Sequence, residues 1–237
     1  MMTDHRTNAF GQPIGAPVSG EFPRPMPPRT DMPGRFCSVV PLDAKQHTSG
    51  LYRAFAQDED GRNWTYLPEE PITSEPAFSD WMKQAERSAD PMFHTVLDAT
   101  GTPVGHATYL RITPDAGVIE VGYIHFSPLM QRTPMATEAM YLMMRRVFDE
   151  LGYRRYEWKC DALNAPSRSA AERLGFTFEG IFRQATHYKG RNRDTAWYSI
   201  LDSEWPRIRS AFEAWLTPEN FDQTGQQRQS LQARASR

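Results

Sequence analysis

The stretch that decides the fold runs from Glu120 to Ala139 and reads EVGYIHFSPLMQRTPMATEA. The run Val118 to Phe126 has the composition of a β-strand, and the helical spacing of apolar residues predicts a helix from Pro134 to Leu151. Thr133 suits the helix N-cap, and proline suits the first helical position. The stretch is therefore a strand that leads through a short loop into the start of a long helix.

Such a helix start has a chemical consequence. The first turn of a helix leaves backbone N–H groups unpaired and carries a partial positive charge, so it suits a phosphate or pyrophosphate. The small side chain of Ala136 leaves room for a ligand, and Arg132 adds positive charge. The capping pattern alone also allows a different interpretation, in which this is an ordinary helix start that binds no phosphate.

Elements of both kinds surround this stretch and indicate an α/β fold. Two helices are predicted early in the chain, and the turn signals around Gly101 and Gly117 separate strand runs at the spacing of antiparallel hairpins. The predicted strands are 37–42, 92–98, 104–111, 118–126, 154–161, 176–182 and 195–201, and the predicted helices are 44–57, 78–89, 134–151, 165–174 and 203–216.

Composition excludes several classes of protein. The chain of 237 residues has 27 Lys and Arg against 29 Asp and Glu, so its net charge of −2 argues against a surface dedicated to nucleic acid or anionic lipid. No apolar run approaches the ~20 residues of a membrane span, and no secretory signal is visible. Two cysteines are too few for a disulfide framework or a typical structural zinc site. We expect a cytoplasmic protein without a metal.

The two ends of the chain differ from its middle. Residues 1–34 are rich in proline and glycine, and we expect an N-terminal arm that builds no packed element. It is either a flexible leader or an extended segment that lies across the domain or a partner chain, because Phe10, Ile14, Val18 and Phe22 recur about every four residues. Residues 217–237 are expected to form a flexible C-terminal tail, which leaves 35–216 as one domain.

Two motifs together resemble the GNAT N-acetyltransferases. Gln131-x-x-Pro-x-Ala136 followed by Thr137-Glu138-Ala139 is similar to their acetyl-CoA loop, in the form found in the ribosomal-protein N-terminal (Rim-type) branch. Asn164-Ala-Pro-Ser167, then Glu172-Arg-Leu-Gly-Phe176, is similar to a later helix of that family. The resemblance spans residues 35–205. It implies a mixed central sheet, mostly antiparallel with a splayed parallel pair, flanked by helices.

The resemblance also implies a coenzyme site for acetyl-CoA, which serves as cosubstrate. Strand N–H groups near Ile124, His125 and Phe126 would polarise the thioester carbonyl, and Asn164 would hold the pantetheine arm. The residues of the phosphate loop would be Gln131, Arg132, Thr133, Met135, Ala136 and Thr137. The chain departs from the family where Pro134 replaces a flexible glycine and removes one N–H donor. The interval from Gly122 to Gln131 is also one residue longer than is common.

Transfer to an amine needs a base and an acid. Glu120 is the candidate base; alternatively, it is a partner in a cross-strand salt bridge. His125 is a second candidate base; alternatively, it is a structural histidine. We expect His125 on the opposite face of the strand from Glu120. Many relatives carry a tyrosine seven positions after the asparagine, but this position is Ala171. Ser167 is the candidate acid, alternatively an ordinary hydroxyl in the first turn of a helix.

The acceptor side of the site is expected near the two early helices. Carboxylates and aromatics that suit a cationic amine cluster there, although a solvated acidic loop has the same composition; they are Asp58, Glu59, Asp60, Trp64, Tyr66, Glu69, Glu70 and Trp81. The basic run 189–193 is either a turn between strands or a contact for RNA or for the 3′-phosphate of the coenzyme.

These motifs predict an N-acetyltransferase that moves acetyl from acetyl-CoA to a primary amine of a peptide N-terminus or a small molecule, by direct attack in a ternary complex. The alternative is a non-catalytic acyl-CoA-binding sensor with the same fold. The expected partners are acetyl-CoA and an amine acceptor. Binding to nucleic acid or to a membrane is not expected, and a homodimer is one possible assembly.

Overall fold

One mixed sheet forms the centre of the computed structural model, which describes residues 6–233. Its eight strands lie in the order β3-β4-β5-β6-β7-β8-β10-β9. Their bounds are β3 (Met32–Pro33), β4 (Cys37–Pro41), β5 (Met92–Asp98), β6 (Pro103–Thr113), β7 (Val118–Phe126), β8 (Arg155–Asp161), β10 (Arg191–Leu201) and β9 (Thr177–Tyr188). All neighbours pair antiparallel except β7 and β8, which are parallel. The predicted mixed α/β sheet with one parallel pair is confirmed.

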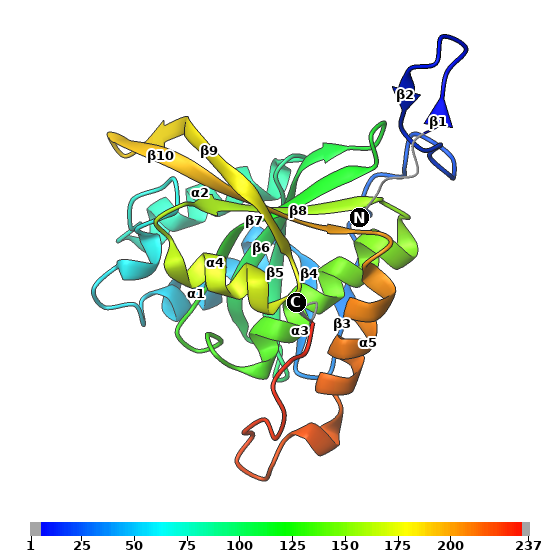
Figure 1. Cartoon of the computed structure of the whole chain (residues 1–237). Coiled ribbons are helices and arrows are strands. Elements are labelled where there is room, and N and C mark those ends of the chain that lie inside the picture. The colour runs from blue at the N-terminus through cyan, green and yellow to red at the C-terminus, as the bar shows by residue number, and fades with distance from the viewer. Residues whose placement is uncertain (1–5, 234–237) are drawn as a thin grey trace.

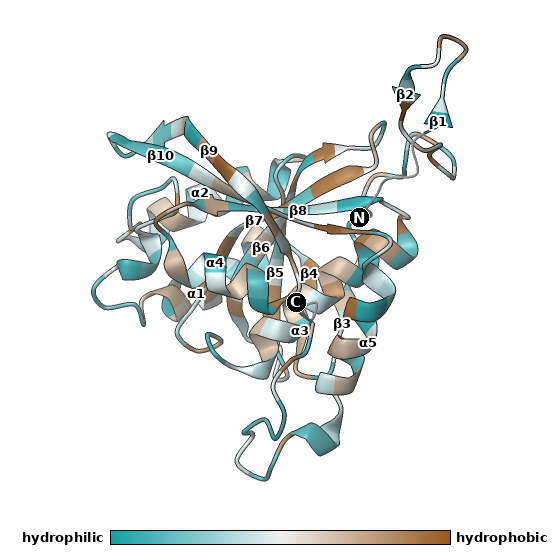
Figure 2. Ribbon diagram, viewed as in Figure 1, coloured by the Kyte–Doolittle hydropathy of each residue, from teal (hydrophilic) through white to brown (hydrophobic). Residues whose placement is uncertain are grey.

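Helices cover both faces of this sheet (Figure 1). One core lies between the sheet and α3 (Pro134–Arg145), α4 (Ala165–Arg173) and α5 (Trp205–Trp215). A second, smaller core lies on the opposite face, under α1 (Ala44–Phe55) and α2 (Glu75–Arg87). Hydropathy colouring shows hydrophobic residues along strands and helices that face these cores, and again along part of the outer strand β9 (Figure 2).

Helix starts follow the capping chemistry of the sequence. The carboxylate of Asp43 accepts the amide of Gln46 at the start of α1. The hydroxyl of Ser74 accepts the amide of Ala77, so α2 begins three residues before the predicted Phe78. At its far end α3 changes into a π-helical turn (Arg146–Glu150) rather than continuing as one regular helix to Leu151.

Strands β7 and β8 separate part-way along their length. Their parallel pairs run from Val118 with Arg155 to Val121 with Trp158, and none follows. Just beyond this point, Tyr123 has a φ of 46°, and the pairing of β7 with β6 shifts by one residue. The result is an open edge on β7 beside the C-terminal half of β8.

This β-bulge changes which face the later residues of β7 occupy. Ile119 and Val121 pack into the α3 core, and after the bulge Ile124 and Phe126 pack against the same core. An extra residue on one strand reverses the alternation of side chains from that point. The predicted placement of His125 on the opposite face from Glu120 was therefore wrong: both face the α1–α2 side.

The N-terminal arm divides into two parts. Its last residues join the domain: Met32 is buried in the main core, and the buried Arg146 donates to the carbonyls of Thr30 and Asp31. A small hairpin of β1 (Arg6–Thr7) and β2 (Pro13–Ile14) instead projects from the body (Figure 1), and Phe10 in its turn is exposed. Residues 1–5 lie outside the described part of the chain.

The C-terminal segment differs from the expected flexible tail. Leu231 and Ala233 are buried in the main core. The indole N–H of Trp215 donates to the side-chain oxygen of Gln227, and Asn220 donates to the carbonyl of Trp215. The few apolar residues of this polar segment are therefore enough to pack it into the core that α4 and α5 share. Residues 234–237 lie outside the described part.

Glu138 fastens α3 to the strand layer. Its buried carboxylate accepts the backbone N–H groups of Arg35, Phe36 and Cys37 at 2.8, 2.6 and 2.9 Å. We expect Glu138→Ala to lower the free energy of unfolding by about 3 kcal/mol, because buried donors that lose a charged acceptor cost about 1–3 kcal/mol each. Urea unfolding measures this loss, and a decrease below 1 kcal/mol would contradict it.

Candidate active site

The open edge of β7 is flanked by the loop that enters α3. In this loop the side-chain amide of Gln131 donates to the carbonyl of Phe126 at 2.7 Å, which fixes the loop to the end of the strand. Arg132 has a φ of 60°, so the left-handed residue of the loop lies two positions before Pro134. The positive φ of the loop therefore falls at Arg132, and Pro134 does not interrupt the turn.

The first turn of α3 keeps free N–H groups. Thr133 is the N-cap residue, but its hydroxyl donates to the carbonyl of Met130 at 2.7 Å and caps no amide. Its own N–H also donates to Met130, so it is not free for a ligand in this conformation. Within residues 6–233, the amides of Arg132, Met135 and Ala136 have no hydrogen-bond acceptor. These three donors fit a phosphate group.

Arg173 on α4 adds charge to this helix start. Its guanidinium donates to the hydroxyl of Thr137 at 3.1 Å and is partly desolvated, which lowers its pKa. Arg173 was not predicted from the sequence, because only the fold brings α4 beside the first turn of α3.

Helix α4 presents Asn164 and Ser167 near the point where β7 and β8 separate. The Oδ1 atom of Asn164 accepts the N–H of Ser167 at 3.1 Å and so caps α4, while its amide N–H₂ has no acceptor among the described residues. The indole N–H of Trp158 donates to Ser167 Oγ at 3.0 Å. Because an indole is only a donor, the Ser167 hydroxyl can itself donate. Its partner in the structure is the Cys160 thiol: burial raises the pKa of Cys160, and the hydrogen bond with Ser167 acts in the opposite direction.

Glu120 lies on the opposite face of the sheet in a cluster of charges. Its carboxylate is 3% exposed and pairs with Arg111 at 2.7 Å and Lys159 at 2.8 Å. Lys159 also pairs with Glu157 at 2.7 Å and lies 3.8 Å above the ring of Trp197. The predicted cross-strand salt bridge exists, and the carboxylate also lies beside Gly122, where the strands begin to separate.

His125 is enclosed by aromatic rings. It stacks on Phe55 with ring centroids 3.8 Å apart, meets Trp64 edge-on at 4.5 Å, and is 2% exposed. Neither of its ring nitrogens has a partner. Burial, with a smaller effect of His106, lowers the pKa of His125 to about 2. A histidine with this pKa is a poor base at neutral pH.

These enclosed histidines predict a dependence of stability on pH. Burial also lowers the pKa values of His94 and His106 to about 4, and unfolding restores about 6.5. The unfolded chain therefore binds more protons below pH 6.5, so stability is lost as pH falls toward 4, by about 1 kcal/mol per histidine and pH unit. Urea unfolding between pH 7 and 5 measures the slope. His125→Phe should flatten it, and an unchanged slope would contradict this assignment.

Several residues predicted for the acceptor side lie in the segment 62–70, which contacts the hairpin of β9 and β10. Lys189 donates to the carbonyl of Trp64 at 2.7 Å and pairs with Glu70, while Arg191 donates to the carbonyl of Thr65 at 2.9 Å. In the basic run 189–193, Lys189 and Gly190 form the turn between strands and the rest begins β10; Lys189 and Arg191 also hold the segment 62–70. The hydroxyl of Tyr66 reaches the carbonyl of Leu163 at 3.2 Å.

The hollows on the α1–α2 side of the sheet differ in the side chains that line them. A pocket of about 400 Å³ has aromatic walls and an acidic rim; its lining includes Tyr52, Phe55, Trp64, Phe78, Asp58, Glu59 and Asp60. Through Phe55 and Trp64 it shares a wall with His125. Trp81, also expected here, instead packs against Phe78 and Phe93.

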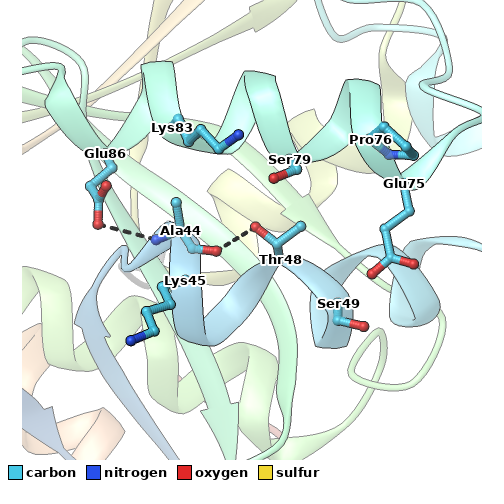
Figure 3. A pocket seen from close by; sticks show the side chains of 9 residues that line it. All are labelled: Ala44, Lys45, Thr48, Ser49, Glu75, Pro76, Ser79, Lys83 and Glu86. Carbon is cyan, nitrogen blue, oxygen red and sulfur yellow. Dashed lines mark hydrogen bonds between the residues drawn. The ribbon is translucent and has the colours of Figure 1, made fainter.

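A larger groove of about 630 Å³ lies between α1 and α2 (Figure 3). Figure 3 shows small and charged side chains along it, with Glu86 accepting the amide of Ala44 and Thr48 donating to the carbonyl of Ala44. Its lining includes no residue of β7, α3 or α4. This groove is therefore separate from the open edge of β7 and from the residues that the sequence predicts for the coenzyme site.

Comparison with known proteins agrees with this geometry. Residues 39–177 match the family model described as the acetyltransferase (GNAT) domain, which is more than half of the chain. The chain belongs to the GNAT acetyltransferase family. It is thus an acyltransferase, and acetyl-CoA is the cosubstrate of its family.

Individual relatives of this GNAT chain are similar over most of its length. A crystal structure of a GCN5-related N-acetyltransferase from Brucella melitensis is 51% identical, covering 89% of this chain and 96% of that one with a TM-score of 0.87. A GNAT-family structure from Chromobacterium violaceum ATCC 12472 is 39% identical, with coverages of 82% and 98% and a TM-score of 0.76. The uncharacterized N-acetyltransferase YnaD of Bacillus subtilis (strain 168) is 26% identical over 59% of this chain and 81% of its own length.

The predicted closeness to the Rim-type branch has weaker support. The ribosomal L7/L12 alpha-N-protein acetyltransferase RimL is 17% identical with a TM-score of 0.62, over 72% of this chain and 93% of its own. Similarity at this level concerns the fold alone. No helix in the described part of this GNAT chain is long and apolar enough to cross a membrane.

Proposed function

We propose that this protein transfers the acetyl group of acetyl-CoA to a primary amine by direct attack in a ternary complex. The observation that carries the proposal is the open edge of β7, which ends at a helix start with free N–H groups. The amides of Arg132, Met135 and Ala136 receive the diphosphate, with Arg173 supplying positive charge. The gap between β7 and β8 beyond Val121 admits the pantetheine.

Two groups at the open edge position the reacting thioester. Backbone N–H groups in the run Ile124 to Phe126 donate to the carbonyl oxygen, where charge develops during attack. The free amide N–H₂ of Asn164 donates to a carbonyl of the pantetheine arm. Ser167 donates its hydroxyl proton to the leaving sulfur, while Trp158 holds its oxygen in place.

Glu120 is the proposed base for the amine. A protonated amine cannot attack, and Glu120 is the carboxylate beside the point where the strands separate. Arg111, whose side chain is 61% exposed, is the partner able to move aside for the substrate, whereas Lys159 is buried. We assign no proton transfer to His125, because Phe55 and Trp64 cover it.

A panel of amines, incubated with acetyl-CoA and followed by thiol release and by mass spectrometry of the product, tests the proposal. We expect release of CoA together with an N-acetylated amine. Calorimetric binding of acetyl-CoA without turnover on any amine would instead support the acyl-CoA sensor. Absence of both binding and turnover would contradict both functions.

Asn164→Asp separates the helix cap from the contact with the coenzyme. Aspartate caps a helix as well as asparagine does, but a carboxylate cannot donate to a carbonyl. We expect the KM for acetyl-CoA to rise about tenfold, the effect of losing one hydrogen bond and leaving an acceptor unpaired, while the melting temperature stays unchanged. An unchanged KM would place the pantetheine elsewhere.

A cytoplasmic location is also proposed. Cys37 and Cys160 are both free and buried, which suits a reducing compartment. The homodimer remains a prediction.

A further inference from the structure

The backbone makes a tight turn at Asn164, directly before α4. Asn164 has a φ of −77° and a ψ of 76°, and the N–H of Ala165 donates to the carbonyl of Leu163 at 2.9 Å, so these three residues form an inverse γ-turn. The turn sets the direction in which the side chain of Asn164 leaves the backbone. Its Oδ1 atom caps α4, and its amide N–H₂ is the group proposed to bind the pantetheine. The conformation of the turn therefore decides where this donor lies.

Polar contacts rather than packing hold this turn, because Leu163 is 79% exposed. Its N–H donates to the carboxylate of Asp161 at 2.8 Å, and Asp161 also accepts the hydroxyl of Tyr188 at 2.8 Å. A carbonyl oxygen has two lone pairs, and the one of Leu163 that Ala165 does not use accepts the hydroxyl of Tyr66 at 3.2 Å. A residue 97 positions earlier in the chain therefore contacts the carbonyl that closes the turn.

Tyr66 is itself held in place by the neighbouring residues of the segment 62–70. Two basic side chains of the β9–β10 hairpin donate to the carbonyls of Trp64 and Thr65, at 2.7 and 2.9 Å. Trp64 also meets His125 of β7 edge-on, with ring centroids 4.5 Å apart. The segment thus contacts β7 on one side of the opening and, through Tyr66, the loop after β8 on the other. Because its backbone is already fixed, the Tyr66 side chain loses little freedom when it forms its hydrogen bond.

We infer that Tyr66 is a positioning residue for the coenzyme site, whose hydroxyl holds the turn at Asn164 so that the side-chain amide is presented to the pantetheine arm. A hydrogen bond to the carbonyl of Leu163 favours the γ-turn over other conformations of this exposed loop. One neutral hydrogen bond changes such an equilibrium by about two- to tenfold. Tyr66 acts through Asn164 and contacts neither the coenzyme nor the reacting atoms. The inference rests on the proposed contact between Asn164 and the pantetheine.

Calorimetric titration of acetyl-CoA into the full chain tests the inference without an amine acceptor. Tyr66→Phe removes the hydroxyl and keeps the ring, so we expect the Kd for acetyl-CoA to rise about fivefold while the melting temperature stays unchanged. Tyr52→Phe is the matched control, because the hydroxyl of Tyr52 donates to the carbonyl of Thr73 at 2.7 Å, in the same connection between α1 and α2. This control should leave the Kd unchanged. An unchanged Kd for Tyr66→Phe would overturn the inference.

A double variant then separates positioning from a direct contact with the coenzyme. Asn164→Asp alone should raise the Kd about tenfold, because a carboxylate cannot donate to the pantetheine. If Tyr66 acts through the amide of Asn164, adding Tyr66→Phe to Asn164→Asp should raise the Kd no further. Independent effects would multiply to about fiftyfold, and that result would overturn the inference.

Two other outcomes concern the proposed function on which the inference rests. If Asn164→Asp leaves the Kd for acetyl-CoA unchanged, the proposed placement of the pantetheine is wrong and the inference is wrong with it. If the parent chain binds no acetyl-CoA, the proposed function itself is contradicted. A rise in Kd for Asn164→Asp without any rise for Tyr66→Phe would leave the proposed function intact and overturn only the role of Tyr66.

Discussion

Replacing Ser167 by alanine is expected to lower kcat about 100-fold, the usual contribution of a positioned general acid. The Ser167 oxygen already accepts a hydrogen bond from the indole of Trp158, so the hydroxyl can donate its proton to a different group, in competition with the Cys160 thiol. In the proposed geometry that group is the leaving sulfur of the coenzyme. Steady-state kinetics at saturating acetyl-CoA and amine measures the loss.

Two controls make this result specific. Ser169→Ala changes an exposed hydroxyl of the same helix and should leave kcat unchanged. Trp158→Phe keeps the ring but removes the N–H that orients Ser167, so a smaller decrease, about tenfold, is expected. A kcat for Ser167→Ala within threefold of the parent enzyme would show that Ser167 is only a residue of the first helical turn.

Lys159→Met should be the most destabilising single change at the charged cluster. Glu120 and Glu157 are paired neighbours on β7 and β8, both buried, and Lys159 lies between their carboxylates. Removing one partner of a buried ion pair costs about 3–5 kcal/mol, because the remaining charges are left uncompensated. At about 2–4 °C per kcal/mol, the melting temperature should fall by roughly 6–20 °C.

Lys83→Met is the matched control for this change. Lys83 pairs with Asp80 at 2.9 Å on the surface of α2, and exposed pairs of this kind contribute about 0–1 kcal/mol. Lys159→Arg should retain most of the stability because it keeps the charge. Equal effects of Lys159→Met and Lys83→Met would show that the buried cluster stabilises the fold no more than a surface pair.

Local patterns predicted most of the elements. The strands Met92–Asp98 and Val118–Phe126 have the predicted bounds, because turn signals flank them. The bulge at Tyr123 was not predicted, since no glycine stands at the residue of positive φ. That single omission placed His125 on the wrong face of the sheet.

The charged parts of the site were harder to predict than the motifs. Asn164 and Ser167 lie in one short segment, so their spacing reveals them. Lys159 takes its role from strands that are distant in sequence but adjacent in the sheet, because it pairs with Glu120 on β7 and with Glu157 on β8. A sequence shows such charges, but only the order of the strands shows which of them pair.

A crystal structure with bound CoA locates the coenzyme directly. We expect the diphosphate on the amides of Arg132, Met135 and Ala136, and the pantetheine between β7 and β8 with its sulfur within hydrogen-bonding distance of Ser167 Oγ. Density for CoA in the groove between α1 and α2, or on the outer face of β9, would contradict this placement.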